Sequence, residues 1–176
     1  MPGYYYTRRH LGGSRSSALM LSALSYSAKH WIRKMAGKTD IVETTFIIST
    51  RCTLRCKDCH NLIPYYRFAQ KAEDFPLEEV TDDLAHLLNC VDSLRVLVLI
   101  GGEPFLHRNL VEILEYIEGQ KKIEKLVLIT NGTIMPGDEA VKAMQRFGRR
   151  LMVSISTYGS TAPRTQAIAK RLNAAG

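Results

Sequence analysis

Three cysteines crowd one short segment of the chain. Cys52, Cys56 and Cys59 lie within eight positions, directly after the apolar run VETTFIIST, whereas the remaining cysteine, Cys90, is distant. A disulfide framework normally uses an even set of cysteines spread along the fold. Clustered thiolates are soft ligands that suit zinc or an iron–sulfur cluster. Zinc needs a fourth ligand, which the adjacent His60 would supply only with strain, whereas a four-iron cluster held by three cysteines leaves one iron open for a substrate or cofactor.

The elements that must position this segment follow from hydrophobic periodicity. Uniformly apolar runs of strand length alternate with segments whose apolar residues recur at helical spacing. Pro76 is expected in the first turn of a helix, and Asn109 and Glu112 are expected to cap the next helix reciprocally, before Gly119 ends it. The expected elements are, in chain order, strand 42–50, helix 74–93, strand 95–100, helix 109–119, strand 124–130, helix 137–148, strand 150–157 and helix 163–175.

This alternation predicts an α/β fold of about four consecutive βα units with a parallel sheet. The uniformly apolar strands further predict that both faces of the sheet are covered. A distinctive short sequence follows each strand, namely CTLRCKDC, GGEP, NGT and TYG, and in a parallel βα array all such exits lie on one rim. An open doubly wound sheet would concentrate its site at one switch point, so four successive exits favour an arc of a (βα) barrel.

The C-x3-C-x2-C segment after the first strand and the GGEP segment after the second together resemble the radical S-adenosylmethionine (radical SAM) superfamily, over about residues 42–160. The resemblance implies that Cys52, Cys56 and Cys59 hold a [4Fe-4S] cluster whose fourth iron chelates S-adenosylmethionine. It implies an enzyme that cleaves S-adenosylmethionine reductively to a 5′-deoxyadenosyl radical, which abstracts hydrogen from an unidentified substrate. An electron donor such as a flavodoxin or ferredoxin would reduce the cluster. Because the cluster needs a reducing compartment, we expect a cytoplasmic protein without structural disulfides.

The resemblance also implies cofactor contacts at the other strand exits. Glycines after the second strand allow the backbone to approach the methionine amino group closely, the acid beside them offers that cation an acceptor, and the proline stiffens the turn. An amide after the third strand and hydroxyls on one face of the fourth suit ribose or carboxylate groups. The chain departs from the family at Asp58, where many members carry an aromatic residue, which leaves adenine without its usual stacking partner. The predicted cofactor-binding residues are Gly101, Gly102, Glu103, Pro104, Asn131, Ser154 and Ser156.

Basic charge is concentrated ahead of this region. Residues 1–40 carry seven basic side chains and one acidic side chain, a net charge of +6, whereas the rest of the chain carries 17 basic and 16 acidic side chains. Such an arm could contact nucleic acid or an anionic membrane or be a solvated lead-in, and an amphipathic helix from about Ser17 to Ile32 fits its pattern. Four serines interrupt the apolar stretch that would otherwise resemble an export signal. No run of 18 apolar residues occurs, so no membrane span is expected.

We therefore expect a basic N-terminal arm over residues 1–40 and a partial radical SAM core domain over residues 41–176. The family's barrel usually has six βα units and this chain supplies four, so we expect a fragment of a longer protein, or a barrel completed by a C-terminal region or a partner. The alternative function is a non-enzymatic zinc or iron–sulfur binding module that interacts with a partner through its basic arm. That alternative explains the cysteines but leaves GGEP after the second strand as a coincidence.

Overall fold

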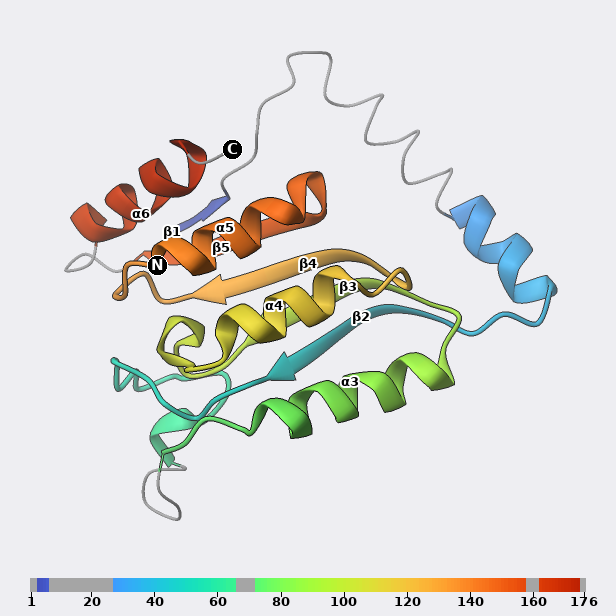
Figure 1. Cartoon of the computed structure of the whole chain (residues 1–176), viewed down its shortest axis with the longest axis horizontal. Helices are drawn as coiled ribbons and strands as arrows, with labels where there is room; N and C mark the ends of the chain where they lie inside the picture. Colours follow the sequence, from blue (N-terminus) through green and yellow to red (C-terminus); the bar gives the residue numbers. More distant parts are fainter. Residues whose placement is uncertain (1–2, 7–26, 66–71, 158–161, 175–176) are drawn as a thin grey trace.

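The computed structural model describes residues 3–6, 27–65, 72–157 and 162–174, and it has the α/β architecture that the sequence predicts (Figure 1). Strands and helices alternate from residue 40 onward. In chain order the elements are β1 (Gly3–Tyr6), β2 (Asp40–Ile47), α3 (Leu77–Cys90), β3 (Ser93–Ile100), the 3-10 turn η1 (Pro104–Leu106), α4 (Leu110–Glu118), β4 (Ile123–Thr130), α5 (Asp138–Arg146), the 3-10 turn η2 (Gly148–Arg150), β5 (Leu151–Thr157) and α6 (Ala162–Ala174).

The strands β1 to β5 form one sheet in the order β1-β5-β4-β3-β2. The neighbours β2, β3, β4 and β5 are parallel, as expected for consecutive βα units. The sequence pattern did not predict β1, which pairs antiparallel with β5 from Gly3 opposite Thr157 to Tyr6 opposite Ser154. Because the four parallel strands run in one direction, their carboxyl ends form a single rim. The cysteine segment and GGEP follow two of these ends.

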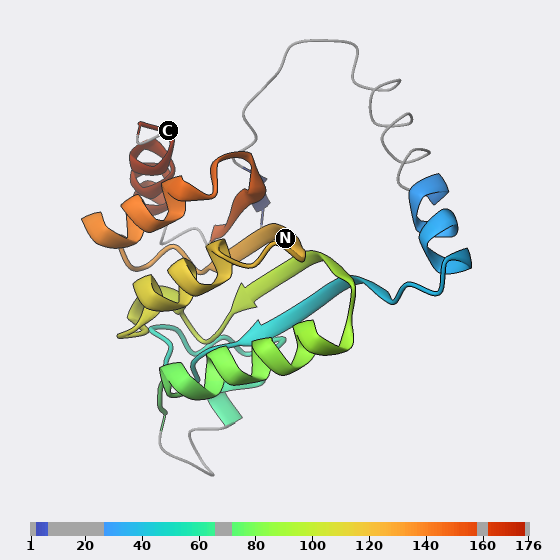
Figure 2. The ribbon, with the colours of Figure 1, turned by 45° about the vertical axis from the view of Figure 1, so that its right-hand side comes forward.

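The helices α3, α4 and α5 cover one face of the sheet and bury the main core (Figures 1 and 2). Their apolar residues recur at three- and four-residue spacing, so each helix presents an apolar stripe to the sheet. In α3 the buried residues of this stripe are Val80, Leu84 and Leu88. On the strands, Leu97 and Leu126 are at most 1% exposed. Burial of each such side chain contributes about 1.5–3 kcal/mol, so this face holds the strands, and with them the rim, in place.

The helices α3, α4 and α5 leave the opposite face of the sheet open. It forms the floor of an open groove of about 690 Å³, lined by alternate strand residues that include Thr45, Ile47, Val98, Val127, Met152 and Ser154. Ile47 remains 40% exposed there. The prediction that both faces of the sheet are covered is therefore wrong for the described part of the chain. The apolar side chains on this face line the inside of a partial barrel instead of a second helical layer.

Residues 27–35 of the basic arm are helical. They overlap the end of the helix predicted over Ser17–Ile32, whose earlier part lies outside the described residues. Arg33 donates two hydrogen bonds of 2.6 Å to the carboxylate of Asp40 at the start of β2, and Ser93 donates a third at 2.8 Å. The hydrogen bonds from Arg33, and to a smaller extent the one from Ser93, lower the pKa of the Asp40 carboxyl group to about 2.

In the part of the chain that the structure describes, no helix combines the length and apolar character that crossing a membrane requires.

The predicted reciprocal cap of α4 is wrong. Asn109 precedes the helix, but its side chain makes no hydrogen bond to the helix backbone. Its Nδ2 donates instead to Oε1 of Glu112 at 3.5 Å, and its backbone N–H donates to Nδ1 of His107 at 3.1 Å. The helix ends at Glu118, with Gly119 next, as predicted. The start of α4 is thus tied to the turn η1 through an imidazole.

Candidate functional site

The three clustered cysteines lie on the loop that follows β2, at the carboxyl rim of the sheet. Cys52, Cys56 and Cys59 are half-buried, Cys90 is exposed at the end of α3, and no disulfide joins any of the four. Among the described residues, no three His, Cys, Asp or Glu side chains lie close enough together to hold a metal ion. The donor set has the chemistry that a [4Fe-4S] cluster needs.

Two N–H groups point at the sulfur of Cys52. The backbone N–H of Leu54 lies 3.4 Å from Sγ, and Nδ2 of Asn131 lies 3.5 Å from it. Burial raises the pKa of the Cys52 thiol, and these two donors act in the opposite direction. Such donors favour the thiolate, which is the form that binds a metal.

The GGEP segment packs directly against the base of the cysteine loop. The N–H of Gly102 donates to the carbonyl oxygen of Ser49, and the N–H of Glu103 donates to that of Arg51, both at 2.8 Å. A Cβ on Gly102 would lie 2.2 Å from the Arg51 carbonyl oxygen and 2.7 Å from Cβ of Cys52. Only glycine permits two backbones to come this close.

Gly101 and Pro104 complete the same turn. A Cβ on Gly101 would lie 2.9 Å from the carbonyl oxygen of Ser49. The carbonyl oxygen of Gly101 accepts a hydrogen bond of 3.4 Å from Nδ2 of Asn61, which lies just beyond the third cysteine. Pro104 is the buried first residue of η1. The turn therefore contacts the residues on both sides of the three cysteines.

The carboxylate of Glu103 is fully buried and accepts hydrogen bonds from donors within the protein. Its Oε1 accepts from Oγ1 of Thr130 at 2.8 Å and from the N–H of Phe105 at 3.2 Å, and its Oε2 accepts from the N–H of Asn131 at 2.8 Å. Burial raises the pKa of Glu103, although the three donors oppose the rise. The carboxylate joins the exit of β3 to that of β4, and its expected contact with the cofactor's amino group stays a prediction.

Asn131, directly after β4, connects this carboxylate to the cysteine loop. Its Oδ1 accepts from the N–H of Thr133 at 2.9 Å, which fixes the orientation of the amide. Its Nδ2 consequently faces Oγ1 of Thr53 at 3.1 Å as well as the sulfur of Cys52. The structure thus brings Cys52, Glu103 and Asn131 together from three separate strand exits.

The two serines of β5 are placed differently. Ser154 lines the groove on the open face of the sheet, and Ser156, two residues later on the same strand, is not among its lining residues. The groove reaches the rim at His60, Asn61 and Leu62, which follow the third cysteine. It therefore leads from the floor of the partial barrel to the cysteine loop.

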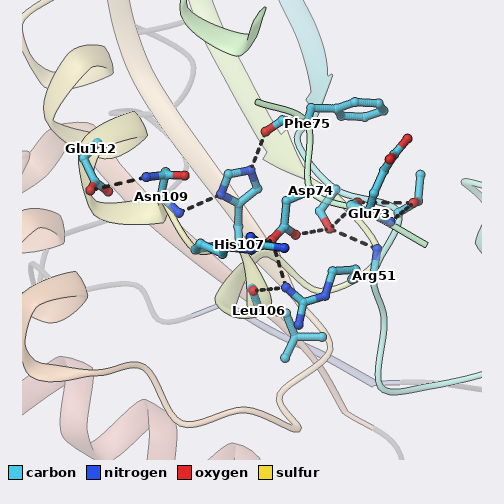
Figure 3. Close-up of polar contacts among 11 residues, drawn as sticks. Arg51, Glu73, Asp74, Phe75, Leu106, His107, Asn109 and Glu112 are labelled. Carbon is cyan, nitrogen blue, oxygen red and sulfur yellow. Dashed lines mark hydrogen bonds and ion pairs between the residues drawn. The ribbon is translucent and has the colours of Figure 1, made fainter. Parts of the chain in front are cut away.

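The sequence patterns missed the polar residues beneath this loop, which Figure 3 shows. Asp74 accepts hydrogen bonds from Ser49 and Arg51, which are 25 and 23 positions away. No local spacing marks such partners. The only signal in the sequence is an acidic residue at the start of the first predicted helix.

Comparison with known proteins identifies the family in which these motifs occur. The model of the Radical SAM superfamily matches residues 46–175. A GTP 3′,8-cyclase of Aquifex aeolicus (strain VF5) is 32% identical over 110 residues, which are 61% of this chain and 33% of that protein. The antilisterial bacteriocin subtilosin biosynthesis protein AlbA of Bacillus subtilis (strain 168) is 30% identical over 118 residues, which are 65% of this chain and 24% of that protein.

A solved structure shares the fold. Streptococcus suis SuiB, bound to the precursor peptide SuiA, matches with a TM-score of 0.54 at 19% sequence identity, covering 97% of this chain and 39% of that one. The present chain therefore spans a third or less of the two sequence relatives named above.

Proposed function

We propose, from the premise that this chain belongs to the radical SAM superfamily, that it is the core of a radical SAM enzyme in which Cys52, Cys56 and Cys59 hold the [4Fe-4S] cluster. Proteins of this superfamily use such a cluster together with S-adenosylmethionine. When bound, the two supply a 5′-deoxyadenosyl radical that abstracts hydrogen from a substrate carbon. One observation carries the proposal: the GGEP turn is hydrogen-bonded to the base of the cysteine loop through the N–H groups of Gly102 and Glu103.

The side chains around the loop have separate tasks in this proposal. The three sulfurs bind iron, and the N–H donors of Leu54 and Asn131 stabilise one of them as a thiolate. The glycine-rich turn offers its backbone to the amino group of S-adenosylmethionine. Asn131, Ser154 and Ser156 offer neutral polar groups that can bind a ribose or a carboxylate.

The substrate is proposed to enter the groove on the open face of the sheet. Its floor is mainly aliphatic, with Ser154 and Thr45 as hydroxyl donors and Glu43 as a carboxylate. An aliphatic floor excludes water from a radical, which protects it from side reactions. A region outside this chain, or a partner, would supply the remaining wall. The proposed electron donor is a flavodoxin or ferredoxin, and the proposed location is the reducing cytoplasm.

Anaerobic reconstitution of the whole chain with iron and sulfide tests this function. We expect the reduced protein to give the electron paramagnetic resonance signal of a four-iron cluster, and we expect that signal to change shape when S-adenosylmethionine is added. The Cys56→Ala variant should lose the signal, whereas Cys90→Ala, which removes an exposed thiol outside the loop, should keep it. Zinc bound by the same three cysteines, with no cluster formed, would contradict the proposal and favour a non-enzymatic metal module.

A further inference from the structure

The residues that precede the first predicted ligand are held from two sides. On one side, residues 102–103 donate two backbone hydrogen bonds of 2.8 Å to residues 49–51. On the other side, residues 73–75 exchange backbone hydrogen bonds of 2.9 and 3.0 Å with residues 48–50. The sulfurs that follow do not converge on a metal position. Residues 48–51 are therefore the fixed base from which the loop must close around a cluster.

Asp74 lies at the centre of this base (Figure 3). Its Oδ1 accepts from Oγ of Ser49 and its Oδ2 accepts from Nη1 of Arg51, each at 2.8 Å. The same Nη1 donates to the carbonyl oxygen of Leu106, in the turn that follows GGEP, at 3.0 Å. Only 8% of the Asp74 side chain is exposed. Burial acts to raise the pKa of Asp74, but the hydrogen bonds from Ser49 and Arg51 outweigh it and leave the pKa below its ordinary value.

The segment that carries Asp74 is itself fixed to the start of α4. Nδ1 of His107 accepts the N–H of Asn109, so the proton of this buried imidazole lies on Nε2 and is donated to the carbonyl oxygen of Phe75 at 3.0 Å. The guanidinium of Arg108 lies 3.6 Å from the Asp74 carboxylate. Asp74 therefore cannot follow the loop if the loop shifts, and it acts as a fixed acceptor.

We propose that Asp74 is a positioning residue for the cluster: acting through Arg51, it holds the backbone at the first ligand against the GGEP turn and so slows loss of the cluster. The inference rests on the proposed function. Arg51 immediately precedes Cys52, so a movement of its backbone moves that ligand. An exposed ion pair would have little effect, whereas this carboxylate is buried. Its removal takes one acceptor from each donor and leaves Ser49 only the carbonyl oxygen of Glu73 and Arg51 only that of Leu106.

The test compares Asp74→Asn with Asp92→Asn in the whole reconstituted chain. Asp92 is the control because its carboxylate also accepts from one cationic side chain and one neighbouring donor, namely Lys38 and the N–H of Thr39. It differs from Asp74 in exposure, 36% against 8%, and in lying at the opposite end of β3. The measurement is the rate at which iron passes to an excess of ferrous chelator under anaerobic conditions. We expect Asp74→Asn to release iron about 10- to 100-fold faster, the range typical of residues that orient metal ligands. Asp92→Asn should release it at the wild-type rate.

Arg51→Met provides a second route that does not depend on how Asp74→Asn folds, because Arg51 lies partly at the surface. We expect it to accelerate iron release similarly, and the double variant to be no faster than either single one, since the two residues act as one unit. Urea unfolding of the cluster-free chains serves as the second readout. A purely structural role would make iron release follow the loss of stability in Asp74→Asn and Asp92→Asn alike, and that result would overturn the inference.

The two proposals fail in different ways. A wild-type chain that takes up no cluster, or only zinc, would overturn the proposed function and this inference with it. A wild-type chain that holds the cluster, together with Asp74→Asn and Arg51→Met chains that release iron at the wild-type rate, would overturn this inference alone.

Discussion

Replacing Gly102 by alanine should disturb the site more than the same change at any other described glycine. The new Cβ would lie 2.2 Å from the carbonyl oxygen of Arg51, whereas ordinary van der Waals contact begins at 3.4 Å, so the two backbones must separate by about 1.2 Å. This movement breaks the hydrogen bond from the N–H of Glu103 to the same oxygen and displaces Cys52. Overpacking costs about 1–3 kcal/mol and the lost hydrogen bond about 1 kcal/mol. We therefore expect the free energy of unfolding to fall by about 2–4 kcal/mol.

Thermal unfolding of the cluster-free chain measures this loss, which corresponds to a melting temperature lower by roughly 5–15 °C. Gly119→Ala is the matched control, because Gly119 has helical dihedral angles and its Cβ would meet nothing nearer than 3.6 Å. It should stabilise the chain by about 0.4–1 kcal/mol. Gly101→Ala, with a nearest contact of 2.9 Å, should lie between the two.

Iron content after reconstitution is the second measurement on the same three variants. Gly102→Ala should bind less iron than wild type, because its clash falls on the carbonyl next to the first ligand, whereas Gly119→Ala should bind the wild-type amount. A Gly102→Ala chain whose stability stays within about 0.5 kcal/mol of wild type, and which binds iron normally, would refute the argument that the close backbone approach builds this site.

Two further predictions concern the ionisable groups of the site. Burial raises the pKa of Glu103 above its ordinary value of 4.5, so the carboxyl group binds a proton more tightly in the folded chain than in the unfolded chain. The stability that this protonation contributes is present below about pH 4.5 and is lost as the pH rises through the raised pKa. Glu103→Gln should abolish this part of the pH dependence, measured by urea unfolding between pH 4 and pH 7, and an unchanged slope would contradict it. Alkylation, read out by mass spectrometry, should label exposed Cys90 before Cys52, whose pKa is raised by burial. Reconstitution should protect Cys52 while leaving Cys90 reactive. Equal protection of both would argue against a cluster on the loop.

The strands and helices of the core could be predicted because their signal is local. Apolar runs near residues 42–50, 95–100, 124–130 and 150–157 became β2, β3, β4 and β5, with bounds that moved by a few residues at most. β1 could not be predicted, because Gly3–Tyr6 gains its partner only when β5 is already in place, about 150 positions away. A four-residue pattern contains no information about so distant a strand partner.

The same difference between local signals and long-range contacts decides which parts of the site could be predicted. The cysteines and GGEP are visible in the sequence because each motif occupies consecutive positions, and the strand exits bring the two motifs into contact. The reciprocal cap expected from Asn109 and Glu112 fails because the buried imidazole of His107, two residues earlier, accepts the backbone N–H of Asn109. That imidazole is held in turn by the carbonyl oxygen of Phe75, from a distant segment of the chain. Asp74 was missed for the corresponding reason, since its partners come from two other segments of the chain.

The direction of the Glu103 side chain shows why a motif alone does not give the role of each of its residues. An acid beside two glycines at a strand exit suggests an acceptor for a cationic amine, yet both of its oxygens are already hydrogen-bonded to protein donors. Through Asn131, one of those donors, it reaches the sulfur of Cys52. A buried carboxylate with three donors resists reorientation, because turning it toward a ligand would leave those donors unpaired. The acid therefore holds Asn131, whose side-chain amide faces the first cysteine, and its expected contact with the amino group of S-adenosylmethionine stays a prediction.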